Sequence, residues 1–301
     1  MAASWLTFML IAQPCISAEA STEQTLTTIQ KRLLAEFDAS IQDIEGYQQR
    51  VTEECAIFPE ANLFPYVLPA LAYGNLALKD PAYAPTAIHA MARLLPPAIR
   101  AVESQLAGQS QGTILSLDTY ALRATELGQI NLALALYRRI GGEDATLLQI
   151  HQHLNRLLSQ ALVQSSGKPL NSYPHLTWPF DTLPCLVSLL LSDPDNSDYR
   201  SLARAHLDWI EREGLHPPTQ LPYGEMGRKL PRGCDLSLRL PLIHHFAPEK
   251  ARAYYERYSR HHWAGMGFRE WPLGFDAGVD IDSGPIFNGI GLSATGNGLA
   301  A

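Results

Sequence analysis

An aromatic, proline-rich loop places a carboxylate at the start of an apolar helix. The loop runs from Tyr173 to Asp181 and reads YPHLTWPFD. Flat rings cover the C–H faces of a sugar or polyol, while a carboxylate serves its hydroxyl groups. Asp181 is therefore a candidate catalytic acid or base, with Tyr173, His175 and Trp178 as candidate substrate-binding residues. Helix capping is an equally weighted alternative for Asp181, because aspartate commonly caps the helix that it precedes.

A glycine-rich loop over residues 265–285 carries the second set of candidates. Long polar loops in a helical chain tend to carry function. Asp280 and Asp282 point the same way in an extended segment, so their repulsion would raise one pKa toward the range of a general acid. Both are candidate catalytic residues and Asp282 is preferred, with a calcium site or a helix-start network as alternatives. The candidate substrate-binding residues of this loop are Arg269, Glu270 and Trp271.

A third segment places an arginine in a tight loop just before another aspartate. Arg232 stands three positions before Asp235 in the sequence PRGCD. Such an arginine either clamps a substrate or forms a structural ion pair, and the structural pair is the more frequent outcome. Arg232 is therefore a candidate binding residue only.

The remaining motifs favour neither a metal nor a cofactor. His151 and His153 are two positions apart on an expected helix and so face different directions, and the other histidine pairs are adjacent. None has the i, i+4 spacing of a helical metal pair. Phosphate-cradling and dinucleotide-binding glycine motifs are missing from the sequence, and Ser283 has no evident histidine partner for a serine hydrolase. We expect no metal and no cofactor.

Composition predicts a globular protein that does not bind nucleic acid. Of the 301 residues, 46% are hydrophobic and 18% are charged, which suits a packed core. Lys and Arg together number 23 against 30 Asp and Glu, giving a net charge of -7. Binding to a polyanion needs a basic surface that this composition does not favour. A small molecule or glycan is the expected partner.

The N-terminus predicts export. An apolar run from Trp5 to Ala12 is followed by Ala18-Glu19-Ala20, which has the small residues of a signal-peptidase site. We expect residues 1–20 to be a cleaved signal peptide and the mature protein to be periplasmic or secreted, without a membrane span. Three cysteines would then remain, which permits at most one internal disulfide. They are Cys55, Cys185 and Cys234.

Apolar spacing predicts one all-α domain over residues 21–301. Some segments are apolar on nearly every side and others have a single apolar stripe, so inner and outer helices are expected to alternate. The expected inner helices are Phe180–Leu191, Asp235–Phe246 and Ser283–Ala301, and the expected outer helices are Asp198–Arg212 and Glu249–His262. Upstream, Leu115–Leu127 and Ile130–Ile140 are expected to form a pair broken at Gly128.

The spacing of aspartates predicts an α/α toroid of helical hairpins. Asp181, Asp235 and Asp282 each head an expected inner helix, 54 and 47 positions apart. A hairpin repeat of roughly 50 residues fits a ring of parallel inner helices wrapped by outer ones. The last residues offer no polar cap, so the toroid is expected to be open or incomplete. Together with Asp118, these aspartates should gather at one end of the molecule.

The C-terminal two-fifths, from Tyr173 to Ala301, resembles a bacterial family of mostly uncharacterised α/α-toroid proteins. The resemblance rests on W-x-x-D at Trp178–Asp181, P-R-G-x-D-L at Pro231–Leu236, R-E-W-P at Arg269–Pro272 and D-x-D-S-G-P at Asp280–Pro285. It implies a fold similar to that of six-hairpin glycosidases. More distantly it resembles linalool dehydratase-isomerase, whose cysteine- and tyrosine-lined pocket would correspond to Cys185, Cys234 and Tyr173.

Three functions follow as hypotheses. The first is a secreted enzyme that acts on a glycan or polyol, with Asp181 and Asp282 as the acid/base pair. The second is a lyase or dehydratase-isomerase that acts on an apolar alcohol in a closed pocket. The third is a non-catalytic helical-repeat scaffold, which ranks lowest because Gly74 and Gly128 are 54 positions apart rather than 34 as in a tetratricopeptide repeat. The sequence leaves the oligomeric state open.

Overall fold

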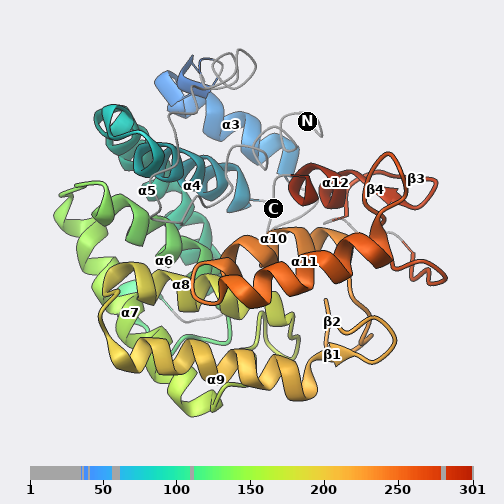
Figure 1. Ribbon diagram of the computed structural model, residues 1–301. Coiled ribbons are helices and arrows are strands. Elements are labelled where there is room, and N and C mark those ends of the chain that lie inside the picture. Colours follow the sequence, from blue (N-terminus) through green and yellow to red (C-terminus); the bar gives the residue numbers. More distant parts are fainter. Residues whose placement is uncertain are drawn as a thin grey trace.

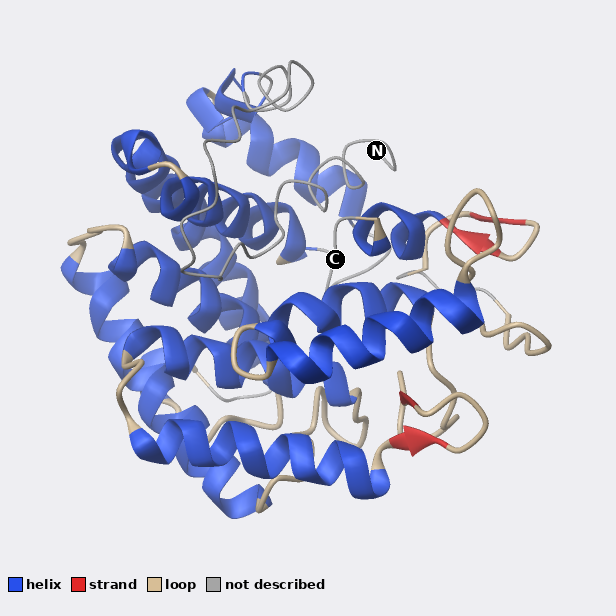
Figure 2. Ribbon diagram, in the orientation of Figure 1, coloured by secondary structure: helices blue, strands red, loops and turns tan. Residues whose placement is uncertain are grey.

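The protein is mostly helical. The computed structural model describes residues 35, 37–39, 41–55, 62–108, 112–278 and 283–299. Within them the only strands form two short antiparallel hairpins, and helices make up most of the rest (Figure 2). The predicted helical class is confirmed. The expected signal peptide, residues 1–20, lies outside the described residues.

Mostly buried helices alternate along the chain with helices that bury one face, and Figure 1 shows where these helices lie. In one group most residues are buried, and these helices are α4 (Phe64–Lys79), α6 (Ala124–Arg139), α8 (Thr182–Ser192) and α10 (Gly233–His244). In the other group one face is buried, and these helices are α5 (Ala84–Gly108), α7 (Ala145–Ser165), α9 (Ser197–Glu213) and α11 (Pro248–His262). The predicted alternation from Phe180 to His262 is confirmed within a few residues at each boundary.

Helices α6 and α8 run parallel and in contact. At their first turns, the Thr125 hydroxyl donates a hydrogen bond to Asp181, and at their far ends Arg138 donates to the Ser192 carbonyl. A glycine allows the close approach, since a Cβ on Gly128 would lie 2.7 Å from the Cys185 sulfur. The expected break at Gly128 is therefore wrong, because this glycine serves packing inside one continuous helix.

The start of α10 lies beside the starts of its neighbours. The loop before α10 bonds to the loop before α8, where the Met226 N–H donates to the Thr177 carbonyl at 3.2 Å. On the other side lies α12 (Leu292–Gly298), and the Tyr258 hydroxyl is 3.2 Å from the carbonyls of both Gly233 and Ala294. The loops that precede α8, α10 and α12 thus lie side by side and bring the candidate segments together.

Two expected helices are corrected. The segment before α6 holds only the short 3-10 helix η3 (Ile114–Ser116), so Asp118 stands in an exposed loop and does not head an inner helix. The final helix does not begin at Ser283. A hairpin of β3 (Ile286–Phe287) and β4 (Ile290–Gly291) comes first, because Asn288 and Gly289 both take positive φ and form the tight turn that Asn-Gly favours.

The remaining elements are small or peripheral. Helix α3 (Ile44–Cys55) packs near the start of the described chain, and η2 (Pro81–Tyr83) joins α4 to α5. A second hairpin pairs β1 (Leu215–His216) with β2 (Leu221–Pro222). In the part of the chain that the structure describes, no helix is both long and apolar enough to cross a membrane.

Candidate functional site

Asp181 stands before α8 but does not cap it. It ends the short 3-10 helix η4 (Pro179–Asp181) and occupies the N-cap position of α8, yet its side chain makes no capping hydrogen bond. Its Oδ2 instead accepts the hydroxyl of Thr125 on α6 at 2.7 Å, and the side chain is 6% exposed. The Asp181 carboxyl group thus lies where α6 and α8 begin, and Thr125 of α6 holds it in place.

The aromatic loop before Asp181 is ordered by its own polar contacts. The rings of Tyr173 and Trp178 meet edge to face, with centroids 5.7 Å apart. The Ser172 hydroxyl accepts the Trp178 N–H at 2.8 Å, which fixes the tryptophan backbone. His175 lies exposed at the tip of a tight turn with φ of 69°. Both aromatic side chains remain half-buried and so keep part of their surface available.

A buried cluster joins two segments that are far apart in the sequence. Glu270 is fully buried, and its Oε1 accepts the Arg232 Nε–H at 3.1 Å. The second residue of α10, Cys234, donates its backbone N–H to Glu270 Oε2 at 3.1 Å and its thiol to Oε1 at 3.0 Å. Glu270 therefore carries out a capping role for α10 from a distant loop, besides pairing with Arg232.

Burial and charge compete at the two carboxyl groups of this region. Burial raises the pKa of Glu270, and the nearby Arg232 guanidinium together with the Cys234 donors opposes that rise. Burial likewise raises the pKa of Asp235, which Arg239 opposes through a hydrogen-bonded ion pair at 2.8 Å. At both carboxyl groups the effect of burial on the pKa therefore exceeds the opposing effect of the neighbouring arginine.

The other predicted binding residues of the glycine-rich loop lie around this cluster. The Trp271 ring lies under the Arg232 guanidinium, 5.7 Å from its centroid, and its Nε1–H donates to the Gly278 carbonyl at 2.7 Å. Arg269 is half-buried, and its carbonyl accepts the Nδ1–H of His262 at 2.9 Å. The structure thus brings Arg232, Glu270 and Trp271 together. Asp280 and Asp282 lie outside the described residues.

The two described cysteine side chains are separate thiols in different surroundings. Cys185 packs against Gly128, and its thiol donates to the Asp181 carbonyl at 3.4 Å. Burial raises its pKa well above the ordinary value, so the group stays a thiol. Cys185 and Cys234 form no disulfide, and the side chain of Cys55 lies outside the description.

Sequence reasoning missed a polar network between α6, α7 and α8. His151 Nδ1 lies 2.8 Å from Asn131 Oδ1, and His151 Nε2 lies 2.9 Å from the Ser192 hydroxyl. The Asn131 amide nitrogen donates to Asn155 and Ser188, so the Asn131 amide oxygen accepts the Nδ1–H of His151. In this neutral tautomer, His151 Nε2 is the acceptor. Burial lowers the pKa of His151 to about 4, which keeps the ring neutral. Polar residues within apolar helices were the available signal.

This network connects α6, α7 and α8 and does not have the geometry of a serine hydrolase site. The Ser192 hydroxyl is also 2.6 Å from the Ser188 carbonyl, one turn earlier in α8. It lies at the C-terminal end of that helix, where carbonyl groups rather than N–H donors face outward. An oxyanion hole needs N–H donors, so the resemblance to a serine–histidine pair carries no hydrolase assignment.

Neither metal geometry nor sequence similarity assigns the site. Among the described residues, no group of three or more His, Cys, Asp or Glu side chains could hold a metal ion. Compared with known proteins, the chain matches no family model and no curated sequence.

Proposed function

We propose that the protein is an exported enzyme of the α/α-toroid class that acts on a glycan or polyol by carboxylate acid/base chemistry. The observation that carries the proposal is the placement of Asp181. A structural aspartate at this position would bond to the first turn of α8, whereas this carboxyl group bonds to Thr125 on α6. Capping therefore does not account for it.

The surroundings of Asp181 support a hydroxylated substrate. The Tyr173 and Trp178 rings precede it in the same loop and keep partly exposed faces. Such rings cover sugar C–H groups, and a carboxyl group beside them can exchange protons with a hydroxyl or glycosidic oxygen. Glu270 and the expected Asp282 are the candidates for the second carboxyl group.

The toroid architecture is supported by the order of helix contacts. Buried helices alternate with half-exposed ones, and α4, α6, α8, α10 and α12 contact one another in that sequence order. The starts of α6 and α8 lie together, and so do the starts of α10 and α12. In a toroid, such an order brings the loops of successive hairpins to one end, where enzymes of that class have their active site.

A glycan panel tests the proposed function. Purified mature protein is screened by thermal shift and then by product analysis for each ligand that stabilises it. Asp181→Asn keeps an acceptor for Thr125, so folding should be largely kept. Turnover should fall about 10²–10⁴-fold, because an amide cannot transfer the proton. Asp208→Asn, on the exposed face of α9, is the matched control and should keep full activity. Full turnover by Asp181→Asn would contradict the assignment.

The contact between Cys234 and Glu270 favours a second candidate, a dehydratase or lyase acting on an alcohol. In such a reaction, an acid in the site donates a proton to the substrate hydroxyl, which leaves as water. A base then removes a proton from the neighbouring carbon, so a C=C bond forms. A thiol 3.0 Å from the carboxyl oxygen can exchange a proton with it.

The two cysteines separate these candidates. If the second candidate holds, Cys234→Ser should lower alcohol dehydration at least tenfold, while Cys185→Ser should keep it because that thiol packs against α6. If the first candidate holds, glycan turnover should tolerate both substitutions far better than Asp181→Asn. Equal effects of the two cysteine variants on dehydration would count against a lyase centred on Cys234.

A further inference from the structure

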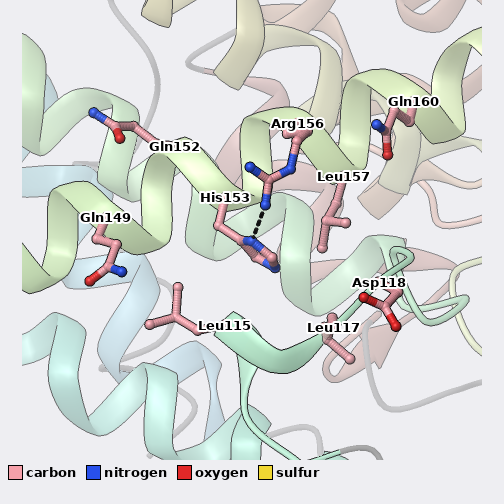
Figure 3. A pocket seen from close by; sticks show the side chains of 9 residues that line it. All are labelled: Leu115, Leu117, Asp118, Gln149, Gln152, His153, Arg156, Leu157 and Gln160. Carbon is pink, nitrogen blue, oxygen red and sulfur yellow. Dashed lines mark hydrogen bonds between the residues drawn. The ribbon is translucent and has the colours of Figure 1, made fainter.

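A polar pocket lies between α7 and the segment that contains η3. None of the residues of the carboxyl cluster (Arg232, Cys234 and Glu270) lines it. Its volume is about 550 Å³, within the range of small-molecule sites. Figure 3 shows its two sides, with Leu115, Leu117 and Asp118 on the loop segment facing the side chains of α7. The α7 residues that line it are Gln149, Gln152, His153, Arg156, Leu157 and Gln160.

Opposite charges line the pocket without pairing. Asp118 projects from the loop side and Arg156 from α7, and both side chains are exposed. Within the part of the chain that is described, neither has a carboxylate or cationic partner within 4.0 Å. Arg156 instead donates a hydrogen bond to His153 Nδ1 at 2.7 Å, which orients its guanidinium at the pocket. A single-sign ligand would meet one favourable and one unfavourable charge here.

The rest of the pocket lining combines amides with apolar surface. Gln149, Gln152 and Gln160 each offer a donor pair and an acceptor, which matches the alternating N–H and C=O groups of a peptide backbone. Leu115, Leu117 and Leu157 supply an apolar wall. Aromatic rings, which favour sugars, are missing from the residues that line this pocket.

We propose that this pocket binds a short zwitterionic peptide with apolar side chains. The peptide carboxylate pairs with Arg156, the terminal ammonium pairs with Asp118, and the apolar side chains lie against the leucines. The ends of an extended dipeptide lie roughly 7 Å apart, a length that a pocket of this volume can hold. The proposal does not depend on the reaction carried out at Asp181 or Glu270.

Calorimetry with blocked peptides tests this assignment. Leu-Leu is titrated into the full-length protein beside N-acetyl-Leu-Leu and Leu-Leu-amide, each of which loses one terminal charge. Leu-Leu should bind, and each blocked form should bind at least tenfold more weakly. Undetectable binding of Leu-Leu at millimolar concentration, or equal binding of all three, would overturn the proposal.

Charge-removing variants assign each end of the peptide. Arg156→Gln should weaken Leu-Leu about tenfold and should no longer distinguish it from Leu-Leu-amide. Asp118→Asn should lose the distinction between Leu-Leu and its N-acetyl form. Arg204→Gln and Asp208→Asn on the exposed face of α9 are matched controls and should leave all affinities unchanged. Variants that weaken all three peptides alike would contradict the assignment of the ends.

Discussion

Glu270 shows how one side chain can serve several neighbours at the residue scale. Removing its charge while keeping its shape, as in Glu270→Gln, leaves the buried Arg232 without that compensating charge. We expect the free energy of unfolding to fall by about 3–5 kcal/mol, the usual cost of breaking a buried ion pair from one side. Urea unfolding measures this loss.

A double variant distinguishes the ion pair from simple packing. Arg232→Met with Glu270→Gln removes both charges, so its cost should be clearly smaller than the sum of the two single costs. Additive costs would mean that the two side chains do not stabilise each other.

Residue types predicted this cluster only in part. The sequence identifies Arg232, Glu270 and Trp271 as candidates, because arginine, carboxylate and tryptophan in irregular loops are typical of binding sites. It could not show that Arg232 pairs with Glu270 rather than with Asp235 three positions away. That choice depends on the hydrogen bond from the Gly233 N–H to the Glu270 carbonyl, a long-range contact. The pairing of Asp235 with Arg239, one turn later in α10, was equally open.

At the scale of elements, the contact between α6 and α8 makes a specific demand on Gly128. In an ordinary helix Gly→Ala adds about 1 kcal/mol of stability, but here the new Cβ would lie 2.7 Å from the Cys185 sulfur. Overpacking of this kind costs about 1–3 kcal/mol, so Gly128→Ala should lower the free energy of unfolding. Adding Cys185→Ala should recover part of the loss.

Gly108→Ala is the control for that experiment, because a Cβ there meets no atom of the described residues within 4 Å. It should be neutral or stabilising in the same urea titration. A stabilising Gly128→Ala would show that α6 and α8 are not as close as described.

Helices with strong patterns were predictable, and segments with local turn chemistry were not. The helices from α8 to α11 follow from their apolar spacing and flanking Asn, Gly and Pro residues. The Leu115–Leu127 prediction was wrong because its apolar residues serve a loop and η3 rather than one helix face. The final helix is shorter than predicted because Asn288-Gly289 forms the tight turn of a hairpin that precedes it.

At the scale of the whole molecule, buried neutral histidines couple stability to pH. Burial lowers the pKa values of His151, His206 and His262 to about 4. An unfolded histidine titrates near 6.5, so between pH 6.5 and 4 the unfolded chain binds more protons than the folded one. These groups therefore make the free energy of unfolding fall as the pH drops through that window, whereas the raised carboxyl pKa values of Asp235 and Glu270 act in the opposite direction.

The contribution of one histidine can be measured by comparing how the free energy of unfolding changes with pH in the wild type and in a variant. His206 donates its Nδ1–H to the Gly167 carbonyl, a role that the amide of His206→Gln can share. That variant should lose up to about 1.4 kcal/mol per pH unit of the wild-type slope between pH 6.5 and 4. Parallel stability profiles for wild type and His206→Gln would contradict the coupling.

The connection between α10, Glu270 and the C-terminal hairpin has a consequence for synthesis. The Gly233 N–H bonds to the Glu270 carbonyl, and the Glu270 N–H bonds in turn to the Gly289 carbonyl. Translation at about 5–20 residues per second delivers Glu270 roughly 2–7 s after Gly233. Until Glu270 has been added, Arg232 cannot form its buried ion pair. The carboxyl cluster is thus assembled late in translation, and slow elongation over residues 233–289 would lengthen exposure to chaperones and proteases.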